Sequence, residues 1–242
     1  MGHTDTLLQV AGGTWRTLLA ARPARDDAEA AALLSGIVGA LSDAEERVVV
    51  LAGSGEGFFL ADVAERATRG LLAETCERLA LHRMPVIAAI DAPALDAGLE
   101  LALACDLRFA APGAPLGMPA VRAGRLPVGG GQRLIHEAGL GTATRLLLLG
   151  DHIRAGDDPA SSLVEVHDAP LAQAELVAAE LATRAPLALQ AMKTAIRASA
   201  EMPPQSGFSV EADLASLLLP TADRAEGISA FLEHRPPRFD GR

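Results

Sequence analysis

Three short apolar runs restrict the folds open to this chain. They read RVVVLAG (Arg47–Gly53), PVIAAI (Pro85–Ile90) and DLRFAA (Asp106–Ala111), and each has the length and composition of a strand buried on both faces. Helical patterns stand between them, one expected over Arg69–His82 and a second, short one over Gly98–Ala104. Strands that alternate with helices at this spacing indicate repeated α/β units rather than a β-sandwich or a helix bundle.

The N-terminal part of the chain extends this pattern. From about Thr6 to Ala20, apolar residues interrupted by Gly12-Gly13 predict one or two further strands. After a polar loop, Asp26 with Glu29 three residues later matches a capping box at the start of a helix. The buried side of that helix is expected on its small and aliphatic residues, namely Ala28, Ala31, Ala32, Ser35, Val38 and Leu41.

The middle of the chain is rich in glycine. Gly129-Gly130-Gly131 is not followed by the lysine of a phosphate-binding loop, so we interpret it as a tight turn before a helix. One helix is expected from Gly130 and another over Thr142–Leu149, followed by a last short strand over Leu163–Val166.

From Leu171 onward the pattern is helical, with breaks expected at Ala185-Pro186, Pro203-Pro204 and Pro220. We therefore expect an α/β core over residues 1–185 and a helical region over residues 186–242.

Composition excludes several classes of partner. The chain has 31 acidic and 21 basic residues and a formal net charge of −10, which argues against a nucleic-acid binder. No polybasic run stands out that would hold an anionic membrane surface, and no stretch approaches the roughly 20 apolar residues of a membrane-spanning helix. The N-terminus shows no secretory pattern, so a cytoplasmic location is expected.

The cysteines and histidines do not indicate a metal site. Two cysteines, Cys76 and Cys105, are too few for a disulfide framework or a cysteine-type zinc site. Cys105 stands in an apolar run, where a buried free thiol is expected. The six histidines are scattered without paired ligand spacing.

Three segments, taken in order, resemble the crotonase family, also called the enoyl-CoA hydratase/isomerase superfamily. Val48–Val63 resembles the family's strand and loop that end Phe-x-Ala-Gly-Ala-Asp. Pro85–Leu134 is similar almost throughout to the family pattern PVIAAVNGxALGGGxELALACDxRIA…FGxPExxLGxxPGGGGTQRL. The tail matches over Ala185–Arg197 and Glu226–Phe239.

This resemblance implies a fold and an assembly. The expected fold is a crotonase-type α/β spiral of ββα units with a C-terminal helical region. The family usually forms homotrimers or dimers of trimers, so residues 186–242 are expected to lie at a subunit interface.

The resemblance also implies an acyl-CoA substrate and a mechanism. The family stabilises negative charge on the thioester oxygen with two backbone N–H groups, which would here belong to Ala61 and Ala97. Glu100, three residues after Ala97, matches the family's first catalytic glutamate. A metal or redox cofactor is not expected, because CoA arrives as part of the substrate.

Further substrate contacts are implied at Arg22, Ala24, Asp62, Gly98 and Ala120. The first two belong to RPARDDA, which resembles the family's RPxxxNA with Asp27 where asparagine is usual. On the C-terminal side of the chain, CoA phosphate contacts or solvated charges are the alternatives for Lys193, Arg197, His234 and Arg235.

Several positions depart from the family pattern. Ala120 replaces the second glutamate, so the two-glutamate arrangement of hydratases is incomplete. Leu60 replaces a glycine in a loop one residue shorter than usual. Asp96 replaces the first glycine before the short helix, where it either caps that helix or supplies a relocated second carboxylate.

Two alternatives therefore stay open. Glu100 either serves the site, or faces solvent or pairs with an arginine such as Arg108 or Arg122. The chain is either an enzyme of this family or a catalytically weak or inactive acyl-CoA-binding paralogue that assembles with related subunits.

Overall fold

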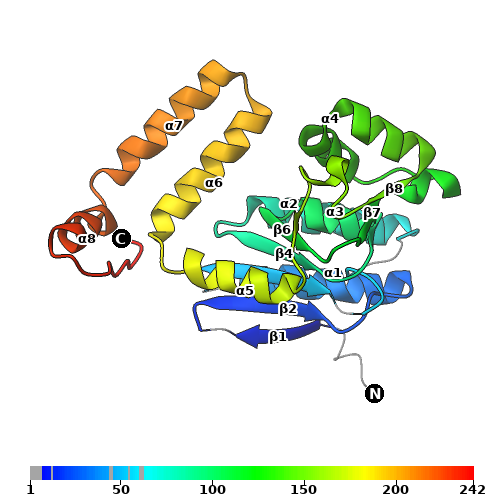
Figure 1. The fold of residues 1–242 in the computed structure, drawn as a ribbon, viewed down its shortest axis with the longest axis horizontal. Coiled ribbons are helices and arrows are strands. Elements are labelled where there is room, and N and C mark those ends of the chain that lie inside the picture. The colour runs from blue at the N-terminus through cyan, green and yellow to red at the C-terminus, as the bar shows by residue number, and fades with distance from the viewer. Residues whose placement is uncertain (1–6, 12, 44–45, 54, 60–62) are drawn as a thin grey trace.

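The computed structural model describes residues 7–11, 13–43, 46–53, 55–59 and 63–242 (Figure 1). Its larger sheet has six strands, in which β1 is antiparallel to β2 and every other neighbouring pair is parallel. Their order across the sheet is β1 (Leu7–Ala11), β2 (Trp15–Ala20), β3 (Val48–Gly53), β4 (Val86–Ile90), β6 (Leu107–Ala110) and β9 (Glu165–Val166). The predicted early strands and the three apolar runs are thereby confirmed.

A second, smaller sheet makes the fold a spiral. It contains β5 (Ala94–Leu95), β7 (Pro115–Gly117) and β8 (His152–Arg154), with β5 parallel to β7 and β7 antiparallel to β8. The chain passes from β4 through β5 to α3 (Ala97–Leu103), and from β6 through β7 to α4 (Gly130–Leu149). Successive turns thus add one strand to each sheet and then a helix, which confirms the expected spiral of ββα units.

Helices cover both faces of the larger sheet. On one face α1 (Asp27–Ser42), α2 (Arg66–Leu81) and α3 share the main core with the strands. On the other face α5 (Pro170–Leu181) and the residue after it place small side chains, Ala174, Ala178 and Ala182, against β3, β4 and β6. Because alanine side chains are small, helix and strand approach closely here.

The structure corrects the predicted buried side of α1. Asp26 accepts the Glu29 N–H at 2.9 Å, so the predicted cap is confirmed, but the Glu29 carboxylate pairs with arginines instead of returning to the cap. Of the six residues expected inside, only Leu41 is buried. The buried residues are Ala30, Leu33, Leu34, Ile37, Ala40 and Leu41. Leucine and isoleucine have more apolar surface to remove from water than alanine, and they decide which side faces the sheet.

Other element boundaries shift modestly. Helix α2 begins at Arg66 rather than Arg69. The two helices expected after the glycine run form α4, which is broken at Gly139 by a non-helical backbone with φ 77° and ψ 159°. Two short 3₁₀ helices, η1 (Pro119–Ala123) and η2 (Asp158–Ala160), complete the core.

The C-terminal helices stand away from this core (Figure 1). They are α6 (Pro186–Glu201), α7 (Pro204–Leu218) and α8 (Ala222–Leu232), and they are separated at the predicted prolines. Helix α7 has no buried residue. Several large apolar side chains of α7, α8 and the turn between them are exposed, namely Phe208, Leu217, Leu219, Ile228, Phe231 and Leu232. Among the described helices, none has both the length and the hydropathy needed to cross a bilayer.

Lys193 fastens α6 to the core. Its Nζ lies 2.7 Å from Oδ2 of Asp106, which precedes β6, and also donates to the carbonyl oxygens of Leu79 and Met84. The same Asp106 oxygen accepts the N–H of Val86 at 2.7 Å. Lys193 therefore has three internal acceptors, which agrees better with a fold contact than with the alternative of a CoA phosphate contact.

We predict that Lys193→Met lowers the free energy of unfolding by about 3 kcal/mol, near the lower bound for a broken buried ion pair because Asp106 is partly exposed. Urea unfolding measures this loss. Arg184→Met is the matched control, since Arg184 belongs to an exposed pair with Glu180 whose removal is expected to cost at most about 0.5 kcal/mol. Equal losses in the two variants would show that Lys193 does not fasten α6.

Candidate active site

Glu100 is a buried carboxylate held by backbone donors. It lies in α3, every residue of which is buried, and is itself only 4% exposed. Its Oε2 accepts the N–H of Gly130 at 2.7 Å and that of Val128 at 2.9 Å. The alternatives of a solvent-facing Glu100 or a pair with Arg108 or Arg122 are wrong. Those two arginines pair instead with Glu137 and Asp151.

The glycine run forms the cradle for this carboxylate. Gly130 is the first residue of α4, and its N–H points at Glu100 across 30 positions of sequence. A Cβ at Gly130 would lie 2.4 Å from Cγ of Glu100 and 2.8 Å from Cε of Met118. The close approach therefore requires glycine. Sequence reasoning identified only a turn here; three consecutive glycines before a helix were the available signal of a backbone donor set.

Burial and nearby positive charges shift the pKa of Glu100 in opposite directions. Burial raises its pKa, while the N–H groups of Gly130 and Val128 and the positive charges of Arg69 and Arg133 partly offset this rise. The net effect is a pKa above the ordinary glutamate value of 4.5. A carboxyl group whose proton affinity is raised in this way suits proton transfer near neutral pH.

The start of α3 places Ala97 beside this carboxylate. The first bond of the helix runs from the N–H of Glu100 to the carbonyl oxygen of Asp96 at 2.9 Å. The N–H of Ala97 precedes that ladder, so helix geometry gives it no intrahelical acceptor. Ala97 is 2% exposed and Gly98 is buried. A thioester oxygen bound by the Ala97 N–H would thus lie about one helical turn from Glu100.

The predictions for Leu60, Ala61 and Asp62 lie outside the described residues. The described residues before and after this stretch are hydrogen-bonded to the RPARDDA segment. The N–H of Ala24 donates to the Phe59 carbonyl oxygen at 2.9 Å. The Asp27 carboxylate accepts the N–H groups of Ala64 at 3.4 Å and Glu65 at 3.1 Å.

Arg22 is engaged within the same segment. Its guanidinium donates to both carboxylate oxygens of Glu29, at 2.6 and 2.9 Å, and Arg25 shares that carboxylate. The two guanidinium groups hold the pKa of Glu29 well below its usual range. Substrate contacts by Arg22 and Ala24 stay predictions.

Asp96 does not cap α3. It occupies the residue before the helix, but its side chain makes no capping bond there. Its Oδ1 instead accepts the N–H of Ala120 at 2.7 Å. The N-cap interpretation is therefore wrong, and the carboxylate lies against the position where the family pattern has its second glutamate. Ala120 itself is 7% exposed.

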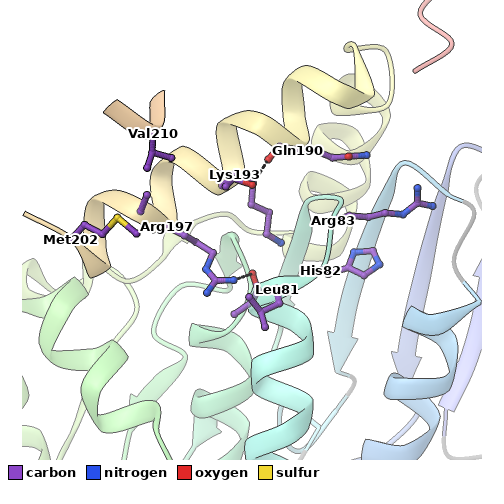
Figure 2. A pocket seen from close by; sticks show the side chains of 11 residues that line it. Leu81, His82, Arg83, Gln190, Lys193, Arg197, Met202 and Val210 are labelled. Atoms are coloured by element: carbon purple, nitrogen blue, oxygen red, sulfur yellow. Dashed lines mark hydrogen bonds between the residues drawn. The ribbon is translucent and has the colours of Figure 1, made fainter. Parts of the chain in front are cut away.

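A cavity of about 480 Å³ opens at a different place, between the C-terminal end of α2 and the α6–α7 pair. Figure 2 shows Lys193 and Arg197 reaching from α6 toward Leu81 and His82. The Lys193 bonds are described above, and Arg197 donates to the Ala80 carbonyl oxygen at 3.4 Å. Burial is the main cause that lowers the pKa of His82. Lys193 and Arg197 are thus tied to the fold by internal hydrogen bonds.

Arg235, another of the sequence candidates, also has internal partners. Arg235 pairs with Glu226 and Glu233. Both cysteines are free and buried, as expected for Cys105. Burial raises the pKa of Cys76 to about 12, which disfavours a thiolate nucleophile. In the part of the chain that the structure describes, three or more His, Cys, Asp or Glu side chains do not gather where they would hold a metal ion.

Comparison with known proteins agrees with this geometry. The sequence profile of the Enoyl-CoA hydratase/isomerase family matches residues 20–242. The chain is 39% identical over 235 residues to 2,3-dehydroadipyl-CoA hydratase of Escherichia coli K12, with 92% of each chain covered. It is 34% identical over 229 residues to human mitochondrial methylglutaconyl-CoA hydratase, covering 86% of this chain and 68% of that one.

A solved structure extends the likeness to the whole fold. The enoyl-CoA hydratase of Bacillus anthracis superposes with a TM-score of 0.89 at 30% identity, covering 98% of this chain and all of that one. The match spans the α/β spiral and the C-terminal helices alike. The chain therefore belongs to the enoyl-CoA hydratase/isomerase family of the crotonase superfamily.

Proposed function

We propose that this family member is an active enzyme on an enoyl-CoA thioester, with Glu100 as its acid/base residue and the Ala97 N–H as a donor to the thioester oxygen. The observation that carries the proposal is the buried carboxylate of Glu100, held by the N–H groups of Val128 and Gly130 one turn beyond Ala97. Ala61 is the proposed second donor, by its place in the family pattern.

The chemistry follows from where negative charge develops. In hydration, the oxygen of water adds to Cβ, the Cα–Cβ double bond opens and the electron pair moves onto the thioester oxygen as an enolate. A backbone N–H aimed at that oxygen lowers the barrier by about 2.7–4 kcal/mol. Glu100 donates its proton to Cα, the water gives up a proton as its oxygen bonds to Cβ, and return of that proton to Glu100 completes the cycle. Isomerisation places negative charge on the same thioester oxygen, with Glu100 moving one proton between two carbons.

Hydration is favoured by the relatives. Two of the proteins similar to this chain are named as hydratases of 2,3-dehydroadipyl-CoA and methylglutaconyl-CoA. We propose a 2-enoyl-CoA as the substrate class, with no cofactor besides the CoA that is part of the substrate.

The test is a panel of 2-enoyl- and 3-enoyl-CoA esters of increasing acyl length, followed by the loss or gain of the absorbance of the conjugated thioester. Hydration of a 2-enoyl ester supports the hydratase proposal, and conversion of a 3-enoyl to a 2-enoyl ester indicates an isomerase. Calorimetric binding of CoA without turnover of any ester would contradict the proposal and favour the inactive acyl-CoA-binding paralogue.

We further propose that the chain assembles through its C-terminal helices as a homotrimer or a dimer of trimers. The exposed apolar side chains of α7 and α8 support this, because such a surface is costly in contact with water. Sedimentation velocity at micromolar concentration is expected to give three or six times the chain mass of 25.0 kDa. A species of single-chain mass would contradict this prediction.

A further inference from the structure

Asp96 has a backbone conformation that an aspartate rarely adopts. Its φ is 44° and its ψ −115°, in a region where glycine carries no steric penalty and a residue with Cβ does. The family pattern has glycine at this position. Since strain of this kind persists only where the surroundings impose it, the contacts of Asp96 indicate what the side chain gains.

Hydrogen bonds to Gly117, Glu100 and Ala120 help to hold Asp96 in place. Its N–H donates to the carbonyl oxygen of Gly117 at 2.9 Å, which ties it to the smaller sheet. Its own carbonyl oxygen accepts the N–H of Glu100 at 2.9 Å, which ties it to the catalytic helix. Its Oδ1 accepts the N–H of Ala120 at 2.7 Å. The backbone is thus fixed from both sides, and the carboxylate is directed to residue 120.

The Asp96 carboxylate lies against a position where this chain departs from the family pattern. At residue 120 the family pattern has a glutamate and this chain has alanine. A carboxyl group therefore lies against the backbone of residue 120 after all, supplied from the residue before α3 instead of from η1.

We propose that Asp96 is the second catalytic carboxylate of this site, replacing the glutamate absent at residue 120. Asp96 takes the proton of the water as the water oxygen bonds to Cβ, and Glu100 donates its proton to Cα as the enolate collapses. The two carboxyl groups then exchange one proton through solvent, which restores both. This inference rests on the proposed hydratase function.

Two substitutions at Asp96 separate proton transfer from positioning. Asp96→Asn keeps an oxygen for the Ala120 N–H but accepts no proton, so kcat is expected to fall about 10²-fold, the low end of general acid–base effects, while KM changes little. Its pH–rate profile is expected to lose the limb that reports the second carboxylate. Asp168→Asn, at an exposed aspartate before α5, is the matched control and is expected to match the wild type.

A further pair of variants separates the loss of the carboxyl group from a folding defect. Asp96→Gly restores the glycine of the family pattern, and adding Ala120→Glu to it restores a carboxyl group at residue 120. The double variant is expected to recover turnover that Asp96→Gly alone loses. The inference is overturned if Asp96→Asn matches the wild type, or if only Asp96→Gly is impaired, which would make Asp96 a positioning residue. Failure of the wild type on every ester would instead overturn the proposed function, and this inference with it.

Discussion

Glu100→Gln is expected to lower kcat by about 10³-fold, within the range for loss of a general acid–base group, while the protein stays folded. Glutamine has nearly the shape of glutamate and keeps an oxygen for the N–H of Gly130. It cannot transfer a proton at neutral pH. Stopped-flow or steady-state turnover of the ester identified in the panel measures the effect.

Glu100→Gln is also expected to change how the free energy of unfolding depends on pH. Because burial raises the pKa of Glu100 above 4.5, the folded state holds this proton more tightly than the unfolded state. Stability therefore falls as pH rises through the window from 4.5 to the raised pKa, where the unfolded carboxyl is ionised and the folded one is not. We expect Glu100→Gln to lack this fall, so its stability relative to wild type increases from pH 4 to pH 8 in urea unfolding.

Glu74→Gln is the matched control, because Glu74 is an exposed residue of α2 paired with Arg78. It is expected to leave both turnover and the pH dependence of stability nearly unchanged. Wild-type turnover in Glu100→Gln would remove Glu100 from the mechanism, and an unchanged pH dependence would mean that its ionisation is not suppressed by burial.

Gly130→Ala is expected to reduce turnover by about 10²-fold, as for a misplacement of a catalytic group by about 1 Å. A Cβ at residue 130 would meet the Glu100 side chain at 2.4 Å, so the carboxylate must move out of its cradle. Overpacking is also expected to lower the free energy of unfolding by about 1–3 kcal/mol. Turnover and urea unfolding measure the two effects.

The neighbouring glycine provides the control. The nearest atoms to a Cβ at Gly131 would be side-chain atoms of Leu147 and Pro127 at 3.7 Å, an ordinary contact, so Gly131→Ala is expected to be nearly neutral. In the Glu100→Gln background, Gly130→Ala is expected to have almost no further effect on kcat, since both changes disable the same carboxylate. Additive losses would show that Gly130 acts on turnover by another route.

The strands and the short helix α3 could be predicted because their signals are local. A run such as PVIAAI is too short and too apolar to be anything but a buried element, and a single carboxylate in the apolar helix at Glu100 stands out in the sequence itself. Prolines at the starts of α6 and α7 likewise predict where these helices begin.

Other features depend on contacts that no local pattern records. Helix α1 has alanine on more than one side, and the larger side chains of Leu33 and Ile37, rather than the alanines that we expected to be buried, face the core. The bond from the Gly130 N–H to Glu100 joins a backbone group to a side chain 30 positions away. The direction of the Asp96 carboxylate depends on a positive φ that the surrounding sheet and helix impose.

The most direct test is a crystal structure of Glu100→Gln with an intact 2-enoyl-CoA bound, since this variant should not consume the ester. The thioester oxygen is expected within about 2.7–3.2 Å of the Ala97 nitrogen, with the side chain of residue 100 beside Cα and Cβ of the acyl group. An ester bound instead in the cavity beneath α6, beside His82 and Arg197, or with its carbonyl turned away from Ala97, would contradict the proposed site.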